Sequence, residues 1–381
     1  MSIEKRGNYM KRFISLMMIV FLLILIVLPD KTFAATPSVS AASAILMDQD
    51  SGRILYEKNA KDVRKIASIT KIMTAILAIE SGKLKEDVKI SDTAVRTEGS
   101  SIYLKPGDIV KLEDLVYGLM LRSGNDAANA IAEHVGGSID GFVFLMNQKA
   151  EEIGMQNTHF ANPNGLDNKD NHFSTAYDMA LLTKYAMQNK TYRKISGTKS
   201  YKGWANKNRL LTEKYKYCTG GKTGFTKKAK RTLVTTATKE HQNLIAVTLN
   251  GPNDWDDHIN MFEYGFKNFD TTVVLDKGKI NNINQKYLKN HIYIKNKVVY
   301  SLTNDEKDKV TIEYQLLKSK KEWKDQKNIP EIVGKAVIYL DEQKLKTVPV
   351  YFKYAEMNEK KGWFNFFVKT FLIHTGVKND G

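Results

Sequence analysis

In residues 43–56 two mostly apolar, strand-like stretches flank a polar Asp-Ser-Gly turn, which predicts a β-hairpin near the start of the chain. The next stretches instead repeat their apolar residues at helical spacing. They begin at Ser68 and at residues 112 and 126, and a break at residues 122–125 separates the last two. We therefore expect mostly helices from Ser68 to about residue 189.

After residue 221 the apolar residues return to a spacing of two, which is the period of a strand. Residues 232–238 and 244–249 predict a second hairpin, and residues 259–269 predict a helix with one apolar face. Strands at both ends of this region, with helices between them, predict one antiparallel sheet flanked by helices and carrying a helical subdomain. The fold class expected for residues 35–270 is therefore α+β.

Residues 271–355 contain only strand-like segments separated by charged turns, which predicts a small all-β domain. The expected strands are residues 272–275, 292–294, 298–302, 310–316, 336–340 and 348–351.

Residues 356–381 form a tail with a concentration of aromatic residues. On a helix, one apolar face would comprise Trp363, Phe364, Phe367, Phe371 and Leu372. The apolar stretch, residues 363–373, is too short to cross about 30 Å of hydrocarbon. We therefore expect an amphipathic helix on a membrane surface, with packing against the β-domain as the alternative.

The first 34 residues have the order of a secretory signal peptide. A basic segment precedes an uncharged apolar run at residues 13–28, and small residues end at Ala34, where we expect cleavage. The basic residues are Lys5, Arg6, Lys11 and Arg12. An uncleaved anchor is the alternative, but a spanning helix needs about 20 apolar residues. A complete signal also follows Met10, which leaves the start open between Met1 and Met10.

Charge and cysteine content fit an exported protein without internal disulfides. Cys218 is the single cysteine, so it has no partner within the chain. The formal net charge is +16, of which the first 34 residues contribute three, leaving +13. Outside the cell, such a basic chain meets lipid headgroups and wall polymers, so we expect no nucleic-acid partner.

The first candidate for catalysis is the pair Ser68 and Lys71. Residues three apart share a helix face, so Lys71 is expected beside the Ser68 hydroxyl. A serine needs an adjacent base to act as a nucleophile, and lysine can be that base when burial or a neighbouring cation lowers its pKa. The Ser-x-x-Lys pattern also begins at Ser2 and Ser196, so the spacing alone does not single out Ser68.

Two further motifs follow downstream. Ser123-Gly124-Asn125 lies between two predicted helices, and a capped helix break explains it as well as a site does. Lys222-Thr223-Gly224 is not the end of a phosphate-binding loop, because that loop needs glycine where this chain has Lys216. A Lys-Thr-Gly strand can instead bind a carboxylate: glycine admits a substrate backbone, threonine donates a hydrogen bond, and lysine adds positive charge.

In this order, the three motifs resemble the active-site set of penicillin-recognising serine enzymes. Flanking stretches narrow the resemblance to the low-molecular-mass D-alanyl-D-alanine carboxypeptidases. The matching stretches are residues 66–74, 98–104, 121–128, 162–166 and 172–178. The likeness covers nearly all of the chain after residue 34, including the β-domain and the tail.

The resemblance implies a role for each motif residue. Ser68 would be the nucleophile, Lys71 its base, and Ser123 the group that relays a proton toward the leaving D-alanine. The implied substrate-binding residues are Asn125 for the amide, Lys222 and Thr223 for electrostatic help and the carboxylate, and Gly224 beside them. Backbone N–H groups of Ser68 and Phe225 would form the oxyanion hole.

Two segments differ from the general family pattern. They are Lys230-Arg231, and Trp255-Asp256-Asp257-His258, where some relatives place an arginine near the substrate carboxylate. We therefore do not assign Arg231 to that role. Both variants resemble the sporulation-specific carboxypeptidases of Gram-positive spore formers, which act on spore-cortex peptidoglycan.

The implied partners are peptidoglycan stem peptides ending in D-Ala-D-Ala, and β-lactams that acylate the same serine. The implied enzyme is a monomer without a cofactor at the outer face of the cytoplasmic membrane or in the cell wall. A class A β-lactamase is the nearest alternative, but its Glu-x-x-Leu-Asn sequence does not occur at Glu133, Glu151, Glu152 or Glu213. A non-catalytic wall- or β-lactam-binding module is the other, and it would not need all three motifs. The histidines lack metal-ligand spacing, so we expect no metal.

Overall fold

The computed structural model describes residues 17–18, 36–167, 171–281 and 283–354. Contacts divide the chain into two compact units, Met1–Thr36 and Pro37–Gly381, and all that follows concerns the second. Apart from residues 17 and 18, the expected signal peptide lies outside the described residues, as does the expected amphipathic tail. Among the described residues, the helices are all too short or too polar to cross a membrane.

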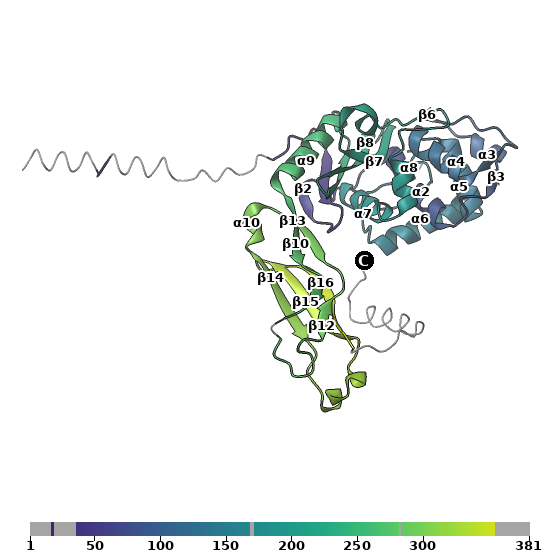
Figure 1. The fold of residues 1–381 in the computed structure, drawn as a ribbon. Helices are drawn as coiled ribbons and strands as arrows, with labels where there is room; N and C mark the ends of the chain where they lie inside the picture. Colours follow the sequence, from purple (N-terminus) through teal and green to yellow (C-terminus); the bar gives the residue numbers. More distant parts are fainter. Residues whose placement is uncertain (1–16, 19–35, 168–170, 282, 355–381) are drawn as a thin grey trace, which may run out of the picture. The chain divides into compact units, whose positions relative to one another are not determined.

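The first sheet joins the two predicted hairpins (Figure 1). One hairpin is β1 (Ser43–Asp48) with β2 (Ile54–Lys58), and the other is β8 (Lys230–Lys239) with β9 (Gln242–Leu249). With β7 (Cys218–Thr226) at one edge, the order is β2-β1-β9-β8-β7, and every neighbouring pair is antiparallel. Because β1 pairs with β9, strands from both ends of this region form one sheet, and the predicted α+β fold is confirmed.

Helices fill most of the sequence between β2 and β7, as their apolar spacing predicts. They are α2 (Lys71–Glu80), α3 (Asp92–Val95), α4 (Leu112–Tyr117), α5 (Asn125–Gly136), α6 (Ile139–Ile153), α7 (Ala176–Ala186) and α8 (Lys190–Ser196). Two small ribbons, β3 (Asp87–Lys89) with β4 (Ile109–Lys111) and β5 (Ser200–Tyr201) with β6 (Trp204–Ala205), lie among them. The helix after β9, α9 (Asp254–Asn268), begins before the predicted residue 259, because acidic residues in its first turn favour a helix start.

The sheet has a hydrophobic core on each face. On one face Ile45 packs with residues of α2 that include Ile72, and on the other Leu46 packs with Met261 and Phe262 of α9. Neighbouring residues of a strand point to opposite faces, which is why Ile45 and Leu46 belong to different cores. Figure 1 shows α9 on one side of β8 and β7, and α2 and α8 on the other.

The C-terminal region has the predicted strands. A two-stranded sheet pairs β10 (Asp270–Leu275) with β13 (Val298–Leu302). A second sheet, of order β11-β12-β16-β15-β14, comprises β11 (Gly278–Lys279), β12 (Ile292–Ile294), β14 (Val310–Leu316), β15 (Ile332–Leu340) and β16 (Gln343–Phe352). The predicted all-β domain is confirmed, and three short helical turns that were not predicted also form between its strands: α10 (Asn304–Lys307), η4 (Lys321–Lys324) and η5 (Gln326–Asn328). A capping box between Thr303 and Glu306 stabilises the first of them.

The turn that carries Ser68 differs from the predicted helix start. Residues Ala67–Thr70 form a 3-10 helix, η1, and α2 begins only at Lys71. Thr70 Oγ1 donates to Ala67 O at 2.8 Å, which closes this tight turn. Ala67 has a φ of 50°, in the left-handed region that non-glycine residues rarely adopt. Gly165 packs directly on the Ala67 carbonyl, since a Cβ built on Gly165 would lie 2.0 Å from Ala67 O.

Substitution of Gly165, with Gly107 as the control, tests the packing of Gly165 on Ala67. Gly165 and Gly107 have φ values of +86° and +85°, but open space surrounds the Gly107 Cβ position. Gly107→Ala should therefore cost only the left-handed strain of about 1–2 kcal/mol. Gly165→Ala should cost about 1–3 kcal/mol more, because its methyl group overpacks the turn before Ser68. Thermal unfolding of both variants measures the difference, and equal melting temperatures would contradict the contact.

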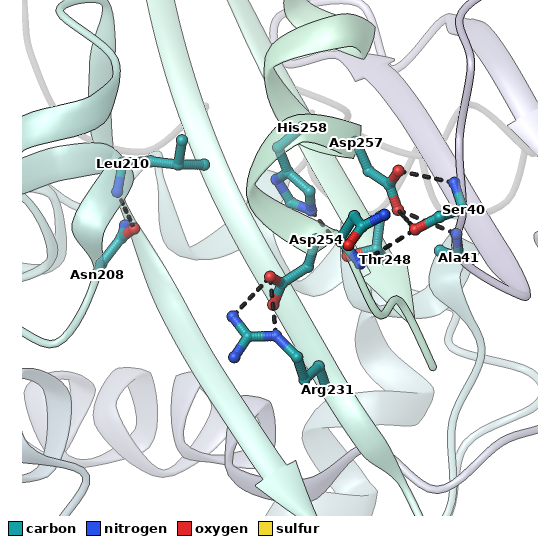
Figure 2. Close-up of polar contacts among 10 residues, drawn as sticks. Ser40, Ala41, Asn208, Leu210, Arg231, Thr248, Asp254, Asp257 and His258 are labelled. Atoms are coloured by element: carbon teal, nitrogen blue, oxygen red, sulfur yellow. Dashed lines mark hydrogen bonds and ion pairs between the residues drawn. The ribbon is translucent and has the colours of Figure 1, made fainter.

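A buried histidine links the packing of α9 to pH. His258 is fully buried, with Nδ1 2.6 Å from Thr235 Oγ1. Its Nε2 lies 3.0 Å from Thr248 Oγ1 (Figure 2). Burial lowers the pKa of His258 to about 3. An unfolded histidine has a pKa of about 6.5, so the unfolded chain binds more protons between these two values. The stability contributed by neutral His258 is complete above pH 6.5 and is lost as the pH falls toward 3.

We therefore expect the free energy of unfolding to fall below pH 6.5, by about 1.4 kcal/mol per pH unit for His258 alone. His258→Gln should be less stable at pH 7.5 but should lose stability less steeply between pH 6.5 and 5.0. Urea unfolding at several pH values gives both slopes. A variant slope as steep as that of the wild type would show that His258 ionises freely in the folded protein.

Candidate active site

Three segments that are distant in sequence meet at one place. Ser68 and Lys71 come from η1 and α2, Ser123 and Asn125 from the end of η2 (Gly118–Arg122) and the start of α5, and Lys222 from β7. Lys71 Nζ lies 2.7 Å from Asn125 Oδ1, across 54 residues of sequence. Lys222 Nζ lies 3.0 Å from Ser123 Oγ, across 99 residues. The structure thus brings together all three motifs found in the sequence.

Lys71 is the most confined of these residues. Its side chain is fully buried, and Nζ lies 2.9 Å from Ser68 Oγ and 2.6 Å from Asn164 O, besides its contact with Asn125. Burial lowers the pKa of Lys71 well below its ordinary value, and the positive charges of Lys222 and Lys207 lower it further. A lysine in this environment can be neutral at physiological pH and so accept a proton.

A second buried amine belongs to Lys222. Only 2% of this residue is exposed, and burial, followed by the nearby charge of Lys207, lowers its pKa to about 7. Nζ donates to Ser123 Oγ and to Thr223 O, the latter at 2.7 Å. Ser123 has a left-handed φ of 64°, because the predicted helix from residue 112 widens into the π-helix η2 and ends there. The hydroxyl of Ser123 therefore meets the tip of Lys222.

Both the oxygen and the nitrogen of the Asn125 side-chain amide form hydrogen bonds within the protein. Its Oδ1 accepts from Lys71, and its Nδ2 donates to Glu98 O at 2.5 Å. Its backbone N also donates to Ser100 O at 2.7 Å. The neighbouring Asp126 is buried and accepts from Ser101 Oγ and from the N–H groups of residues 102 and 104. The loop at residues 98–104 is thereby fastened to the turn that carries Ser123 and Asn125.

β7 brings its backbone close to Ser68. A Cβ built on Gly224 would lie 2.9 Å from Ser68 N and 2.4 Å from Thr232 Oγ1, so no side chain fits at this position. Thr223, one residue earlier, is partly buried, while Phe225 is 65% exposed. The two residues whose N–H groups are candidates for an oxyanion hole, Ser68 and Phe225, therefore lie on adjoining segments.

The segments that depart from the family pattern, residues 230–231 and 255–258, form contacts that attach α9 to neighbouring parts of the domain (Figure 2). Arg231 donates from Nε and Nη2 to Asp254 Oδ1 at 3.0 and 2.6 Å, so its charge is already paired. Asp257 accepts from Ser40 N at 2.7 Å and Ser40 Oγ at 2.8 Å, which fastens the chain ahead of β1. These contacts agree with leaving Arg231 out of the candidate site.

Two residues at the site were not assigned a role from the sequence. Asn164 lies in a stretch that carries the family resemblance, and only the fold shows that its carbonyl faces Lys71. Lys207 donates to Ser100 Oγ at 3.0 Å, but no pattern distinguishes it among 58 lysines and arginines.

Other residues considered from the sequence lie outside this arrangement. The Ser196 hydroxyl is buried and accepts from Gly221 N at 2.9 Å, which gives it a structural use. Burial raises the pKa of the Cys218 thiol to about 11, so it is not a thiolate nucleophile. In the described part of the chain, no group of three or more His, Cys, Asp or Glu side chains is arranged to hold a metal ion.

Comparison with known proteins adds family information to this geometry. The family described as D-alanyl-D-alanine carboxypeptidase, peptidase S11, matches residues 30–253, and the C-terminal domain of penicillin-binding protein 5 matches residues 269–356. D-alanyl-D-alanine carboxypeptidase DacF of Bacillus subtilis is 38% identical over 248 residues, which is 61% of this chain and 63% of that protein. DacC of Escherichia coli is 38% identical over 263 residues, or 62% of this chain and 64% of that protein.

Solved structures extend the likeness over more of the chain than the curated relatives do. Penicillin-binding protein 5 from Haemophilus influenzae has a TM-score of 0.71 at 28% identity, covering 84% of this chain and 98% of that one. Penicillin-binding protein 6B from Escherichia coli has a TM-score of 0.64 at 27% identity, covering 84% and 97%. In the sequence comparison, the chain spans a little under two thirds of the length of the curated relatives named above. The protein belongs to the D-alanyl-D-alanine carboxypeptidase family, peptidase S11.

Proposed function

We propose that this protein is a serine-type D-Ala-D-Ala carboxypeptidase that works through an acyl-enzyme on Ser68. The observation that carries the proposal is the set of oxygens around Lys71 Nζ. Asn125 Oδ1 and Asn164 O can only accept hydrogen bonds, so a neutral amine donates its two protons to them. Its lone pair is then directed at the Ser68 hydroxyl, 2.9 Å away. This is the geometry of a general base beside its nucleophile.

In acylation, Lys71 takes the proton of the Ser68 hydroxyl while Oγ bonds to the carbonyl carbon of the penultimate D-alanine. The negative charge on the carbonyl oxygen is stabilised by the N–H groups of Ser68 and Phe225. As the C–N bond breaks, the proton that Lys71 took from Ser68 passes through Ser123, which Lys222 contacts, to the leaving D-alanine amine, and Lys71 becomes neutral again. The products are an ester on Ser68 and free D-alanine.

In deacylation, a water molecule attacks the ester carbonyl, and Lys71 takes the proton of that water. Breaking the ester bond returns the proton to Ser68 Oγ and releases the shortened peptide. The net reaction is hydrolysis of one peptide bond, with no group left on the enzyme. β-Lactams would enter the same first step, because ring opening provides the acyl group without a departing fragment.

Substrate binding along β7 fits the topology of the sheet. β7 is the edge strand, and Gly224 lets a substrate backbone pass close to Ser68. The terminal carboxylate would be bound by Thr223 and by the positive charge of Lys222, while Asn125 holds the substrate amide. The substrates are then peptidoglycan stem peptides ending in D-Ala-D-Ala, whose shortening limits cross-linking.

The location and the biological setting are part of the same proposal. The signal peptide at residues 1–34 would export the protein, which would act as a monomer at the outer face of the cytoplasmic membrane or in the cell wall. A role in spore-cortex peptidoglycan rests on the resemblance of residues 230–231 and 255–258 to the sporulation-specific enzymes. The division into residues 35–270 for catalysis and 271–355 for the all-β domain is the organisation we propose for the mature chain.

The first test concerns the nucleophile. Ser68→Ala should abolish covalent labelling by a fluorescent penicillin and release of D-alanine from a peptide ending in D-Ala-D-Ala, because the attacking oxygen is gone. Ser196→Ala, which removes the other serine of a Ser-x-x-Lys pattern in the mature chain, should keep the label. Labelling by Ser68→Ala at the wild-type level would contradict the mechanism.

The second test concerns membrane attachment by the tail. A chain truncated after Tyr354 should move from the membrane pellet to the soluble fraction while penicillin labelling persists. The aromatic face would no longer enter the interface, and the tail lysines would no longer meet anionic headgroups, worth about 1 kcal/mol each. If the truncated protein still sediments with membranes, attachment lies elsewhere, with an uncleaved N-terminal segment as the first candidate.

A further inference from the structure

Two histidines are buried in the part of the chain that the structure describes, and they have different surroundings. His172 is 1% exposed and His258 is 0% exposed. Burial lowers the pKa of each to about 3, so both are neutral at physiological pH. A neutral imidazole has one donor and one acceptor nitrogen, and the bonds around the ring fix which is which.

The tautomer of His172 follows from its neighbours. Ala161 N lies 3.0 Å from Nδ1, and an amide N–H can only donate, so Nδ1 is the acceptor. The proton is then on Nε2, which donates to Thr70 Oγ1 at 2.8 Å. The Thr70 hydroxyl in turn donates a hydrogen bond to Ala67 O at 2.8 Å. The donor and the acceptor of each of these three hydrogen bonds are therefore defined.

Both ends of this series of hydrogen bonds, Ala161 and Ala67, lie next to segments that form the candidate active site. At one end, Ala67 precedes Ser68, and its strained φ of 50° is held by the bond from Thr70. At the other end, Ala161 opens the segment that leads to Asn164, whose carbonyl lies 2.6 Å from Lys71 Nζ. His172 therefore connects the turn that carries Ser68 to the segment that holds Lys71.

We propose that His172 is a positioning residue for the acylation of Ser68, acting through Thr70 and Ala67 to hold Ser68 Oγ within reach of Lys71 Nζ. This inference rests on the proposed function. The distance of 2.9 Å between those two atoms is within the range in which a base can take a proton. Without the donor at Nε2, Thr70 can turn away from Ala67 O, and the strained turn before the nucleophile relaxes.

His258 provides the matched control. It has the same burial and the same lowered pKa, and its two nitrogens also have threonine hydroxyls as neighbours. Those hydroxyls belong to Thr235 on β8 and Thr248 on β9, under α9 and on the face of the sheet opposite to α2. Substitution of His258 therefore removes a buried, hydrogen-bonded histidine without touching the turn that carries Ser68.

The variants distinguish loss of the hydrogen-bond donor at His172 Nε2 from loss of the imidazole ring. In His172→Gln the amide nitrogen can occupy the place of Nε2 and still donate to Thr70, whereas the side chain in His172→Asn is too short. Thr70→Val keeps the shape but breaks the chain of hydrogen bonds, and Thr70→Ser keeps the hydroxyl. The matched controls are His258→Gln and His258→Asn. The readout is the second-order rate of acylation by a fluorescent penicillin, with thermal unfolding to give the folded fraction.

We expect His172→Asn and Thr70→Val to acylate about 100-fold more slowly than the wild type, which is the cost of a misplacement of about 1 Å. The loss should not multiply in the double variant, because both substitutions break one chain. His172→Gln and Thr70→Ser should recover most of the rate, and both His258 variants should stay within about threefold of the wild type when corrected for folded protein.

Comparable rates for His172→Asn and His258→Asn would overturn the inference, since both histidines would then be structural only. A nitrogen-15 NMR spectrum of the folded wild-type protein gives an independent check, because it should show His172 neutral with the proton on Nε2. A proton on Nδ1, or on both nitrogens, would also overturn it. An unlabelled wild type would instead refute the proposed function itself, which separates the two failures.

Discussion

A buried lysine amine is the constraint on which the rest of the site depends. Burying an uncompensated ammonium is costly, so the group either has a charged partner or becomes neutral. Lys71 has no carboxylate within the hydrogen-bond contacts described for it, and its three partners are a hydroxyl and two amide-type oxygens. Three elements must therefore converge on one nitrogen. The same convergence that satisfies the amine also aligns it with Ser68.

Burial is the largest cause of the lowered pKa of Lys71, and the nearby amines add to it while Asp126 opposes them. Lys222 and Lys207 both lower the pKa of Lys71, and Lys207 also lowers that of Lys222. Such a group of amines is costly without a ligand, because each proton added to one makes the next less favourable. A ligand that brings a carboxylate reverses this effect. An enzyme specific for a free C-terminus gains from this arrangement, because its substrate provides the missing negative charge.

The sequence predicts an element of the fold well when the residues that determine it are close together in the sequence. Both hairpins, the helical block and the C-terminal strands follow from spacing, because each is formed by neighbouring residues. The first turn at Ser68 is a 3-10 turn rather than the start of the α-helix, and its setting is not local, because Gly165, almost a hundred residues away in the chain, packs on Ala67. Short turns such as α10 were missed for a different reason, since their capping residues are embedded in charged, strand-like sequence.

The site shows the same division. The three motifs could be found because serine, lysine and glycine are needed as residue types, and the structure brings those motifs together. The carbonyl of Asn164 could not be found in this way, because any residue supplies a carbonyl and only the fold decides where it points. The direction of the hydrogen bond from His172 is likewise invisible in sequence. It depends on which backbone N–H faces Nδ1.

Backbone strain explains why so much support surrounds two serines. Ala67, directly before Ser68, and Ser123 both have left-handed φ values, of 50° and 64°. A non-glycine residue in that region costs on the order of 1–3 kcal/mol, and such strain persists only where neighbouring groups hold it in place. For Ala67 those groups are Thr70 and the close packing of Gly165, and for Ser123 they include the buried tip of Lys222. A relaxed turn at either position would be more stable locally, but it would direct the hydroxyl away from its amine. The buried contacts around these turns therefore offset strain that the positions of the two hydroxyls require.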